Sequence, residues 1–402
     1  MNLRILRIAP VCVLVWFNFA AAQATRPAGL EPGQAEAQQR ATTLPLIRQF
    51  TSPALEVRGV WLASSSMTAA PDVLRRHLDA IRSANFNTVL IDTYFRGYVA
   101  YPGGAVVPQF PDFKGQDVLG LLIDESHRRG LRAELWMEYG FYAYFTSDAT
   151  KDESMGPILD AHPDLLSINA RGDRFIHRSF GDFYSICPSN PKSHEILATI
   201  FVEAVSKYPH ADGVNLDRIR YADADYCFCN YCKTQFHADT GIELKPFPDA
   251  SDQARQWLQW KRRQTLKAVR TITQKLRAAR PGIVITSYVV GPDEMDSKAQ
   301  GWDLWMQEGL LDAVAVSMYS ADVLPAMQRA IELLGGDRSR LIAALSCAQQ
   351  TDVYLSNIEL ARRHGLPGHF TWHFGDLLDD IQPLRHGPHQ APAKSPFQSR
   401  DP

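Results

Sequence analysis

Between residues 57 and 374 the sequence alternates between short apolar runs and longer segments whose apolar residues have helical spacing. A short apolar run bounded by turn residues is typical of a buried strand, and apolar residues three or four positions apart are typical of a helix packed on a sheet. This alternation favours parallel strands connected by helices. We expect strands at residues 57–63, 87–95, 131–137, 212–217, 283–290, 311–318, 341–346 and 368–374.

The eight strand–helix units predict an α/β protein with a single-domain (β/α)8 TIM barrel. The alternative is an open doubly wound sheet, but the Gly-x-Gly-x-x-Gly motif typical of that fold does not follow the first strand. A long insertion rich in aromatic and charged residues follows the third strand, at residues 138–190. The expected helices are residues 71–84, 118–129, 192–207, 252–279, 299–308, 323–334, 352–364 and 377–384.

Residues 1–24 have the three parts of a secretory signal peptide. Arg4 and Arg7 precede a mostly apolar run over residues 8–19, and an Ala-x-Ala type cleavage region follows at residues 20–24. The alternative is a membrane anchor, but the run is short for a membrane span. We therefore expect an exported protein, periplasmic or secreted, with no membrane span after cleavage.

Composition sets the other boundaries. Residues 25–53 are rich in Ala, Gln, Pro and Gly and predict a linker, and the proline-containing residues 386–402 predict a disordered tail. Residues 54–385 then form the catalytic domain. The net charge of -2, without a block of Lys or Arg, argues against a nucleic-acid partner. Nothing in the sequence indicates the oligomeric state.

Polar and aliphatic side chains alternate in the expected strand at residues 212–217, which places Asn215 and Asp217 on the same face. The active site of a TIM barrel lies at the carboxyl ends of its strands. Asp217 is therefore our first candidate for a catalytic carboxylate, and Glu138, at the end of the third strand, is the second. Glycoside hydrolysis uses two such groups: one donates a proton, and the other attacks or activates water.

Each of these acidic residues has an alternative interpretation. Asp217 paired with a neighbouring arginine would only hold its loop, and Glu138 would only orient the substrate or brace the barrel. Asp293 and Glu294, after the fifth strand, are rival partners for Asp217. For Asp92, within the second strand, we expect a structural hydrogen bond.

Other polar and aromatic residues at the strand ends suit a carbohydrate substrate. Aromatic rings cover the apolar faces of sugars, and polar side chains bond their hydroxyl groups. This pattern predicts a glycoside hydrolase that cleaves a poly- or oligosaccharide. The alternative is a catalytically inactive glycan-binding barrel that keeps the groove without a working acid pair. The expected substrate-binding residues are Asn215, Arg220, Tyr221, Glu294, Tyr319 and Trp372.

Cysteines form a second cluster. Cys227, Cys229 and Cys232 lie within six residues after the fourth strand, a spacing that suits a metal better than a disulfide. With Cys187 and Cys347, the chain without its signal peptide has an odd number of cysteines, which is a poor basis for a disulfide framework. The pattern fits four cysteines in one site and one buried thiol. The alternative is a disulfide, most simply Cys227–Cys232, which an oxidising periplasm favours.

Several short motifs, taken in their order, resemble the glycosyl-hydrolase-like family 10 of bacterial exported proteins, over about residues 55–380. The resemblance implies a (β/α)8 barrel that hydrolyses glycosidic bonds, with Asp217 matching the acid of the fourth strand. Some members act on peptide-free peptidoglycan strands, which makes cell-wall glycan one candidate substrate. The resemblance gives no equally firm match for the acid that would work together with Asp217. The motifs are Arg58-Gly-Val-Trp61, His127-Arg-Arg-Gly130, His162-Pro-Asp-Leu-Leu166, Asp212-Gly-Val-Asn-Leu-Asp217 with Arg220-Tyr221, and Trp302-Asp-Leu-Trp305 followed by Asp312 and Met318-Tyr319.

The cysteine pattern is similar to the zinc cluster of family 42 β-galactosidases, in which one cysteine precedes the third helix and three follow the fourth strand. This resemblance implies a closed structural Zn²⁺ site made of Cys187, Cys227, Cys229 and Cys232. The chain departs from family 42 because Asp217-Arg218 stands where that family has an Asn-Glu pair. The acid of family 42 therefore does not transfer to this sequence, and β-galactosidase activity is not expected.

Overall fold

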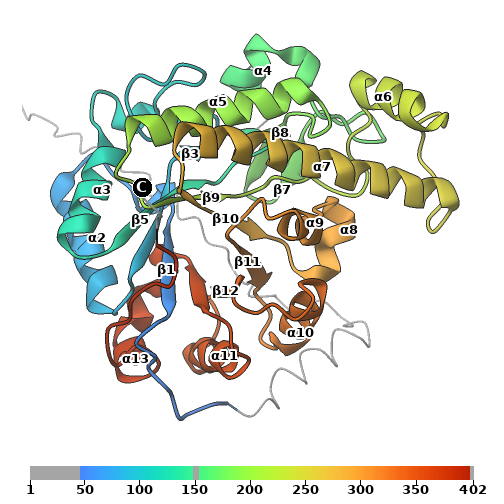
Figure 1. Cartoon of the computed structure of the whole chain (residues 1–402). Coiled ribbons are helices and arrows are strands. Elements are labelled where there is room, and N and C mark those ends of the chain that lie inside the picture. Colours follow the sequence, from blue (N-terminus) through green and yellow to red (C-terminus); the bar gives the residue numbers. More distant parts are fainter. Residues whose placement is uncertain (1–45, 148–153, 399–402) are drawn as a thin grey trace, which may run out of the picture. The chain divides into compact units, whose positions relative to one another are not determined.

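The structure, a computed structural model, describes residues 46–147 and 154–398. Eight parallel strands close into a barrel in which each barrel strand pairs with the next one along the chain and the last pairs with the first (Figure 1). The predicted (β/α)8 fold is therefore confirmed. The expected signal peptide and most of the expected linker lie outside the described residues. Within the described ranges, no helix combines the length and the apolar character needed to cross a bilayer.

All eight expected strands form the barrel. The second is shorter than expected: it ends at Asp92, and the following residues form a separate antiparallel pair, β3 (Tyr94–Phe95) and β4 (Tyr98–Val99). The barrel strands are β1 (Val57–Leu62), β2 (Thr88–Asp92), β5 (Arg132–Met137), β9 (Gly213–Leu216), β10 (Val284–Val289), β11 (Ala313–Met318), β12 (Leu341–Ser346) and β13 (Gly368–Trp372).

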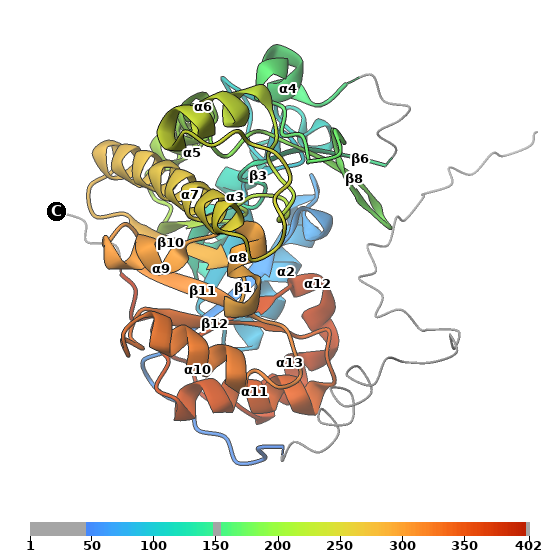
Figure 2. The ribbon, with the colours of Figure 1, turned by 90° about the vertical axis from the view of Figure 1, so that its right-hand side faces the viewer.

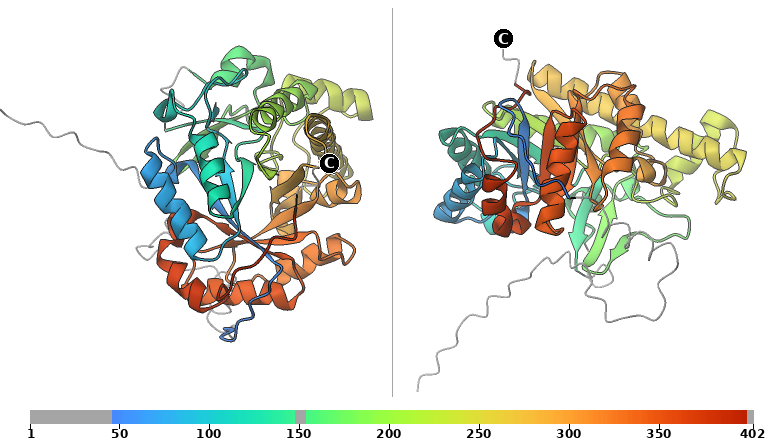
Figure 3. Two further views of the ribbon diagram at one scale, coloured as in Figure 1. Left: turned by 60° about the vertical axis from the view of Figure 1, so that its left-hand side comes forward. Right: turned by 90° about the horizontal axis from the view of Figure 1, so that it is seen from below.

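Helices surround the barrel, as Figure 3 shows. Side chains cap the starts of several of them; for example, Asp117 accepts from Gly120 N, and Ser251 accepts from Ala254 N. The expected last helix is broken into two short pieces, α12 (Phe374–Leu377) and α13 (Ile381–His386). The others are α2 (Pro71–Ser83), α3 (Val118–Arg128), α4 (Pro157–Ala161), α5 (Pro191–Lys207), α6 (Asn230–Thr240), α7 (Asp252–Ala279), α8 (Met295–Lys298), α9 (Trp302–Gln307), α10 (Leu324–Leu333) and α11 (Thr351–Arg363).

The insertion after β5 has its own small antiparallel sheet. Its strands β6 (Tyr142–Thr146), β8 (Gly181–Ser185) and β7 (Ile176–Arg178) pair in that order. In Figure 2 this sheet projects to one side of the barrel, away from α10 and α11. The insertion therefore adds a wall beside the barrel and leaves the barrel topology unchanged.

Large aromatic rings fill the inside of the barrel. Trp61, Trp136 and Phe370 are almost completely buried there, and small residues such as Ala315 make room for them. Gly59 has the same role: a Cβ at this position would lie 2.3 Å from the Phe370 ring. The barrel is therefore a packed core, and polar chemistry is confined to its ends.

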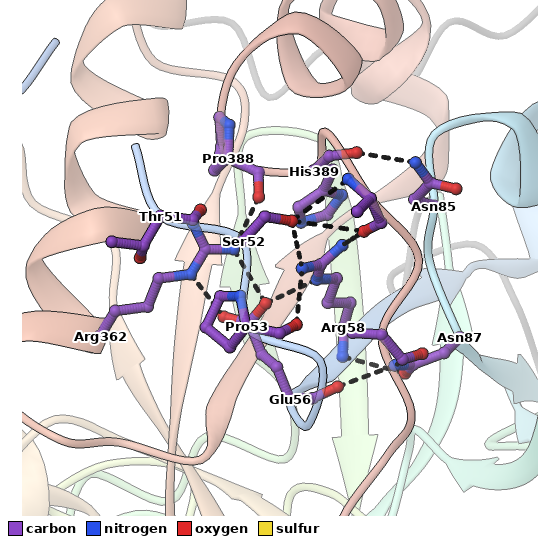
Figure 4. A network of polar contacts seen from close by, with 12 residues as sticks. Thr51, Ser52, Pro53, Glu56, Arg58, Asn85, Asn87, Arg362, Pro388 and His389 are labelled. Atoms are coloured by element: carbon purple, nitrogen blue, oxygen red, sulfur yellow. Dashed lines mark hydrogen bonds and ion pairs between the residues drawn. The ribbon is translucent and has the colours of Figure 1, made fainter. Parts of the chain in front are cut away.

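A buried polar network lies at the N-terminal end of the barrel, where the strands begin (Figure 4). Glu56 is its centre: it accepts hydrogen bonds from Arg58 Nε at 2.5 Å and from Arg362 Nε at 2.7 Å. All three side chains are almost fully buried. The charges thus compensate one another out of contact with water.

The C-terminal tail takes part in this network, in contrast to the expected disorder from residue 386. Arg58 Nη1 donates to Ala391 O at 2.7 Å, and Asn85 Nδ2 donates to His389 O at 2.7 Å. Buried donors need acceptors, and the carbonyl groups of residues 386–398 supply them. Composition conceals this role because any residue can offer a backbone carbonyl.

Candidate active site

Asp217 follows β9 at the C-terminal end of the barrel, and only 5% of it is exposed. Its Oδ2 accepts a hydrogen bond from Trp136 Nε1 at 3.2 Å, and its Oδ1 accepts one from Arg218 N at 2.5 Å. Two residues earlier on the same face, Asn215 donates to Thr286 Oγ1 at 2.8 Å inside the barrel. The strand therefore directs both polar side chains inward, as its alternation predicts.

Burial sets the proton affinity of Asp217. Removing a carboxylate from water disfavours its charged form. Burial raises the pKa of Asp217 to about 6, although the charges of Arg218 and Arg220 oppose the rise. The nearby carboxyl group of Glu138 adds to it. Asp217 therefore retains its proton closer to neutral pH than an ordinary aspartate does.

Glu138 lies next to this group because the segments that follow β5 and β9 are in contact. Its Oε1 is 3.1 Å from Arg218 Nη2, and 13% of its side chain is exposed. Phe141 N donates to Arg218 O at 3.2 Å. At Gly140, where φ is +47°, a Cβ would lie 2.2 Å from Asp217 O, so only glycine fits. Both candidate carboxyl groups are thus brought to one place.

Aromatic rings hold Arg218 in position. Its guanidinium carbon is 4.9 Å from the centre of the Tyr139 ring, 5.3 Å from that of Tyr142 and 5.8 Å from that of Phe183. These residues come from the insertion, whose sheet therefore forms part of the site. Arg218 Nη1 is buried and has no hydrogen-bond partner among the described residues.

Asp92, at the end of β2, is a third carboxyl group at this end of the barrel. It is fully buried, and its Oδ2 accepts a hydrogen bond from Ser64 N at 2.9 Å. Burial, followed by the charge of Glu138, raises the pKa of Asp92 well above its usual range. The bond from Ser64 is the structural hydrogen bond expected from the sequence, whereas the proximity of Asp92 to Glu138 was not predicted.

Two of the expected aromatic residues lie above the rings inside the barrel. Tyr319 stacks on Tyr288, with ring centres 6.1 Å apart at an angle of 22°. Trp372 is 5.6 Å from Trp136 and 5.9 Å from Trp61 between ring centres. Tyr288 was not among the residues predicted for the site, although the alternation in Val284–Val289 places it on the inner face.

The remaining expected substrate-binding residues lie in different surroundings. The guanidinium carbon of Arg220 is 5.7 Å from the centre of the Tyr142 ring, close to Arg218. Glu294 is exposed, on the short turn of helix after β10. Tyr221 is completely buried, and its hydroxyl is bonded to Ser189 Oγ at 2.6 Å. Tyr221 therefore has no surface for a substrate.

Four buried cysteines meet behind this end of the barrel. The sulfur atoms of Cys187, Cys227, Cys229 and Cys232 all lie within 4.8 Å of one another. The Cys187 and Cys232 sulfurs are 3.5 Å apart, much farther than the roughly 2.0 Å of a disulfide bond, and all four thiols are free. Around a tetrahedral zinc with Zn–S bonds of about 2.3 Å, sulfur atoms lie roughly 3.8 Å apart. The cluster is therefore compatible with a closed metal site and does not form the alternative disulfide.

A parallel barrel with carboxyl groups, arginines and aromatic rings at its C-terminal end is the architecture of glycosidase-type proteins. A family model described as "Glycosyl hydrolase-like 10" matches residues 56–340, which is more than half of the chain. The chain belongs to this family.

Known relatives agree with this assignment. Glycosyl hydrolase DigH of Escherichia coli (strain K12) is 24% identical over 339 residues, which cover 73% of this chain and 69% of DigH. The catalytic domain of a β-amylase from Paenibacillus polymyxa superimposes with a TM-score of 0.60 at 12% identity, covering 81% of this chain and 94% of that domain. At such low identity the structural similarity shows the fold alone.

Gan42B, a GH42 β-galactosidase from G. stearothermophilus, superimposes with a TM-score of 0.58 at 15% identity. The match covers 81% of this chain and 52% of Gan42B, about half of that longer protein. It shows that the two proteins share the barrel fold.

Proposed function

We propose that this protein is a glycoside hydrolase in which Asp217 donates a proton to the departing sugar oxygen and Glu138 is the second carboxylate. The observation that supports the proposal most strongly is the burial of Asp217 beside Glu138. Burial raises the pKa of Asp217 to about 6. A general acid works best when its pKa lies near the working pH, and unequal surroundings of two carboxyl groups separate their roles.

Glu138 then attacks the anomeric carbon or activates a water molecule. Its ion pair with Arg218 at 3.1 Å fixes the carboxylate, and the surrounding rings fix the arginine. Tyr319 and Trp372 cover the apolar faces of the sugar rings.

The family supports a carbohydrate as the substrate, and we propose peptide-free peptidoglycan glycan strands as the first to test. Purified protein is incubated with these strands and, separately, with plant and microbial polysaccharides, and the release of reducing ends is measured. We expect release from at least one of them. Binding without release from every glycan would instead support an inactive glycan-binding barrel.

We further propose that the four cysteines hold one structural Zn²⁺. A metal bound by four thiolates has no open position for water, so it would pin the loop after β9 to the start of α5 and take no part in the reaction. The buried ammonium group of Lys261, which donates to Ala224 O at 2.9 Å and Tyr226 O at 3.1 Å, lies near enough to offset the negative charge of such a site.

Elemental analysis tests the metal. We expect about one zinc per chain, the number held by one tetrathiolate site, and its loss together with a lower melting temperature in Cys232→Ser. Metal-free wild-type protein of unchanged melting temperature would contradict the proposal.

The signal-like N-terminus supports export, to the periplasm or the medium. Fractionation of producing cells followed by N-terminal sequencing tests this proposal. We expect a mature chain that begins after residue 24. A chain that keeps Arg4 and Arg7 and stays in the cytoplasm would contradict it.

A further inference from the structure

The register of the barrel brings Asp92 and Glu138 together. In the pairing of β2 with β5, Asp92 is opposite Trp136. Glu138 follows Trp136 by two residues and therefore continues the same inward face. Two carboxyl groups from adjacent strands thus meet at the C-terminal end of the barrel, within hydrogen-bonding reach of each other.

The two oxygens of Asp92 differ in their partners. Oδ2 accepts from Ser64 N at 2.9 Å. Oδ1 is buried, and no donor among the described residues reaches it. A buried carboxylate oxygen without a donor is costly, but a protonated one can itself donate to an acceptor. The carboxyl group of Glu138, which lies within hydrogen-bonding reach of Asp92, can accept it.

Several other titratable groups lie near this pair, among them Tyr139, which interacts with both carboxyl groups. Glu138 faces Arg218, with which it forms its ion pair, and also lies near Asp217 and His373. No ion pair within the described residues joins Asp92 to a cation. Burial and the charge of Glu138 both favour the neutral form of Asp92, whose pKa is raised well above its usual range.

We infer that Asp92 is protonated at neutral pH and donates a hydrogen bond from Oδ1 to Glu138, so that the two carboxyl groups share one proton. Asp92 is a positioning residue: with Arg218 it fixes the second carboxylate of the proposed reaction, and its catalytic importance rests on the proposed function. Each carboxyl oxygen of Asp92 then has one hydrogen-bond partner, since Oδ2 accepts from Ser64 N and Oδ1 donates to Glu138.

Carbon-13 NMR of protein labelled at the aspartate and glutamate carboxyl groups tests the proton directly, whether or not the protein is an enzyme. We expect one protonated aspartate signal at pH 7 that is missing from Asp92→Asn. In Glu138→Gln the same signal titrates at lower pH, because the neighbouring negative charge is gone. The control is Glu134→Gln, another buried glutamate on β5, which leaves this titration in place. Spectra of wild type and Asp92→Asn with equal numbers of protonated carboxyls at pH 7 would overturn the inference.

Kinetics on peptide-free peptidoglycan strands separates positioning from simple packing. Asp92→Ala removes the donor and lowers kcat by on the order of ten- to a hundredfold, the value of a hydrogen bond to a charged group. Asp92→Asn keeps a donor and recovers part of that loss. Equal kcat in the two variants would overturn the positioning role. If the wild type releases no sugar, the proposed function fails, and the NMR result alone decides the protonation of Asp92.

Discussion

Both ends of the barrel bury acidic residues, but their surroundings shift the pKa values of these residues in opposite directions. At the N-terminal end Glu56 accepts hydrogen bonds from Arg58 and Arg362. Burial alone would raise the pKa of Glu56, yet Arg362 and the other nearby cations outweigh it and lower the pKa. At the C-terminal end burial prevails, and the pKa of Asp217 rises to about 6.

This difference separates stability from chemistry. A buried carboxylate that is paired with arginines stabilises the fold at neutral pH. A buried carboxyl group that keeps its proton near neutral pH can instead protonate a substrate. Under the proposed function, fold stability and catalysis are therefore assigned to opposite ends of the same strands. The same substitution, carboxylate to amide, distinguishes them.

The largest expected effect is on activity at the C-terminal end. Asp217→Asn cannot donate a proton, and we expect kcat for glycan hydrolysis to fall about 10²–10⁴-fold, the usual contribution of a general acid. Reducing-end release measures this loss, and circular dichroism checks that the fold is kept. Glu56→Gln is the matched control, since its active site is intact. A similar loss of kcat in both variants would break the distinction between the ends.

The next effect is on stability at the N-terminal end. Glu56→Gln leaves two buried arginines without their carboxylate, and we expect it to lower the unfolding free energy by about 3–5 kcal/mol at pH 7. The folded-state pKa of Glu56 is lowered, so its stabilisation is present above the unfolded-state pKa and is lost as the pH falls through the folded-state value. Denaturant unfolding at pH 7 and at acidic pH should show the cost shrinking in acid. A cost that stays constant with pH would contradict this account.

Asp217→Asn should have the opposite effect on stability. The folded-state pKa of Asp217 is raised to about 6, so the native protein loses stability as the pH rises from the unfolded-state value through 6. Removing the charge is expected to raise the unfolding free energy by up to about 3 kcal/mol above pH 6, and by little below pH 4. The same unfolding series measures it. Destabilisation that is largest at high pH would mean that Asp217 is matched by its arginines, as Glu56 is.

The smallest effect concerns Tyr221, which lies beside the cysteines and away from any substrate. Tyr221→Phe loses the bond to Ser189, and we expect it to cost about 0.5–1.5 kcal/mol of stability while leaving KM unchanged. Tyr319→Ala, in contrast, is expected to raise KM. Thermal unfolding and steady-state kinetics separate the two variants. A raised KM in Tyr221→Phe would instead indicate that Tyr221 contacts the substrate.

The barrel could be predicted because periodicity and strand order are local properties of the sequence. The alternation of Asn215 and Asp217 located the centre of the candidate site in the same way. Contacts between distant segments could not be predicted from the sequence. The packing of Gly140 against Asp217 brings Glu138 to Arg218. At the other end of the barrel, backbone carbonyls of residues 386–398 accept hydrogen bonds from buried donors such as Arg58. Tyr221 was misplaced because adjacency to Arg220 in sequence says nothing about which way a loop residue turns.

The pH dependence of sugar release by the wild type and Asp217→Asn tests the central claim most directly. If Asp217 is the proton donor, kcat of the wild type falls as the pH rises through about 6, the pKa that burial gives to Asp217, and the small residual activity of Asp217→Asn lacks this fall. A wild-type rate that does not change between pH 5 and 8, or full turnover by Asp217→Asn, would contradict the account.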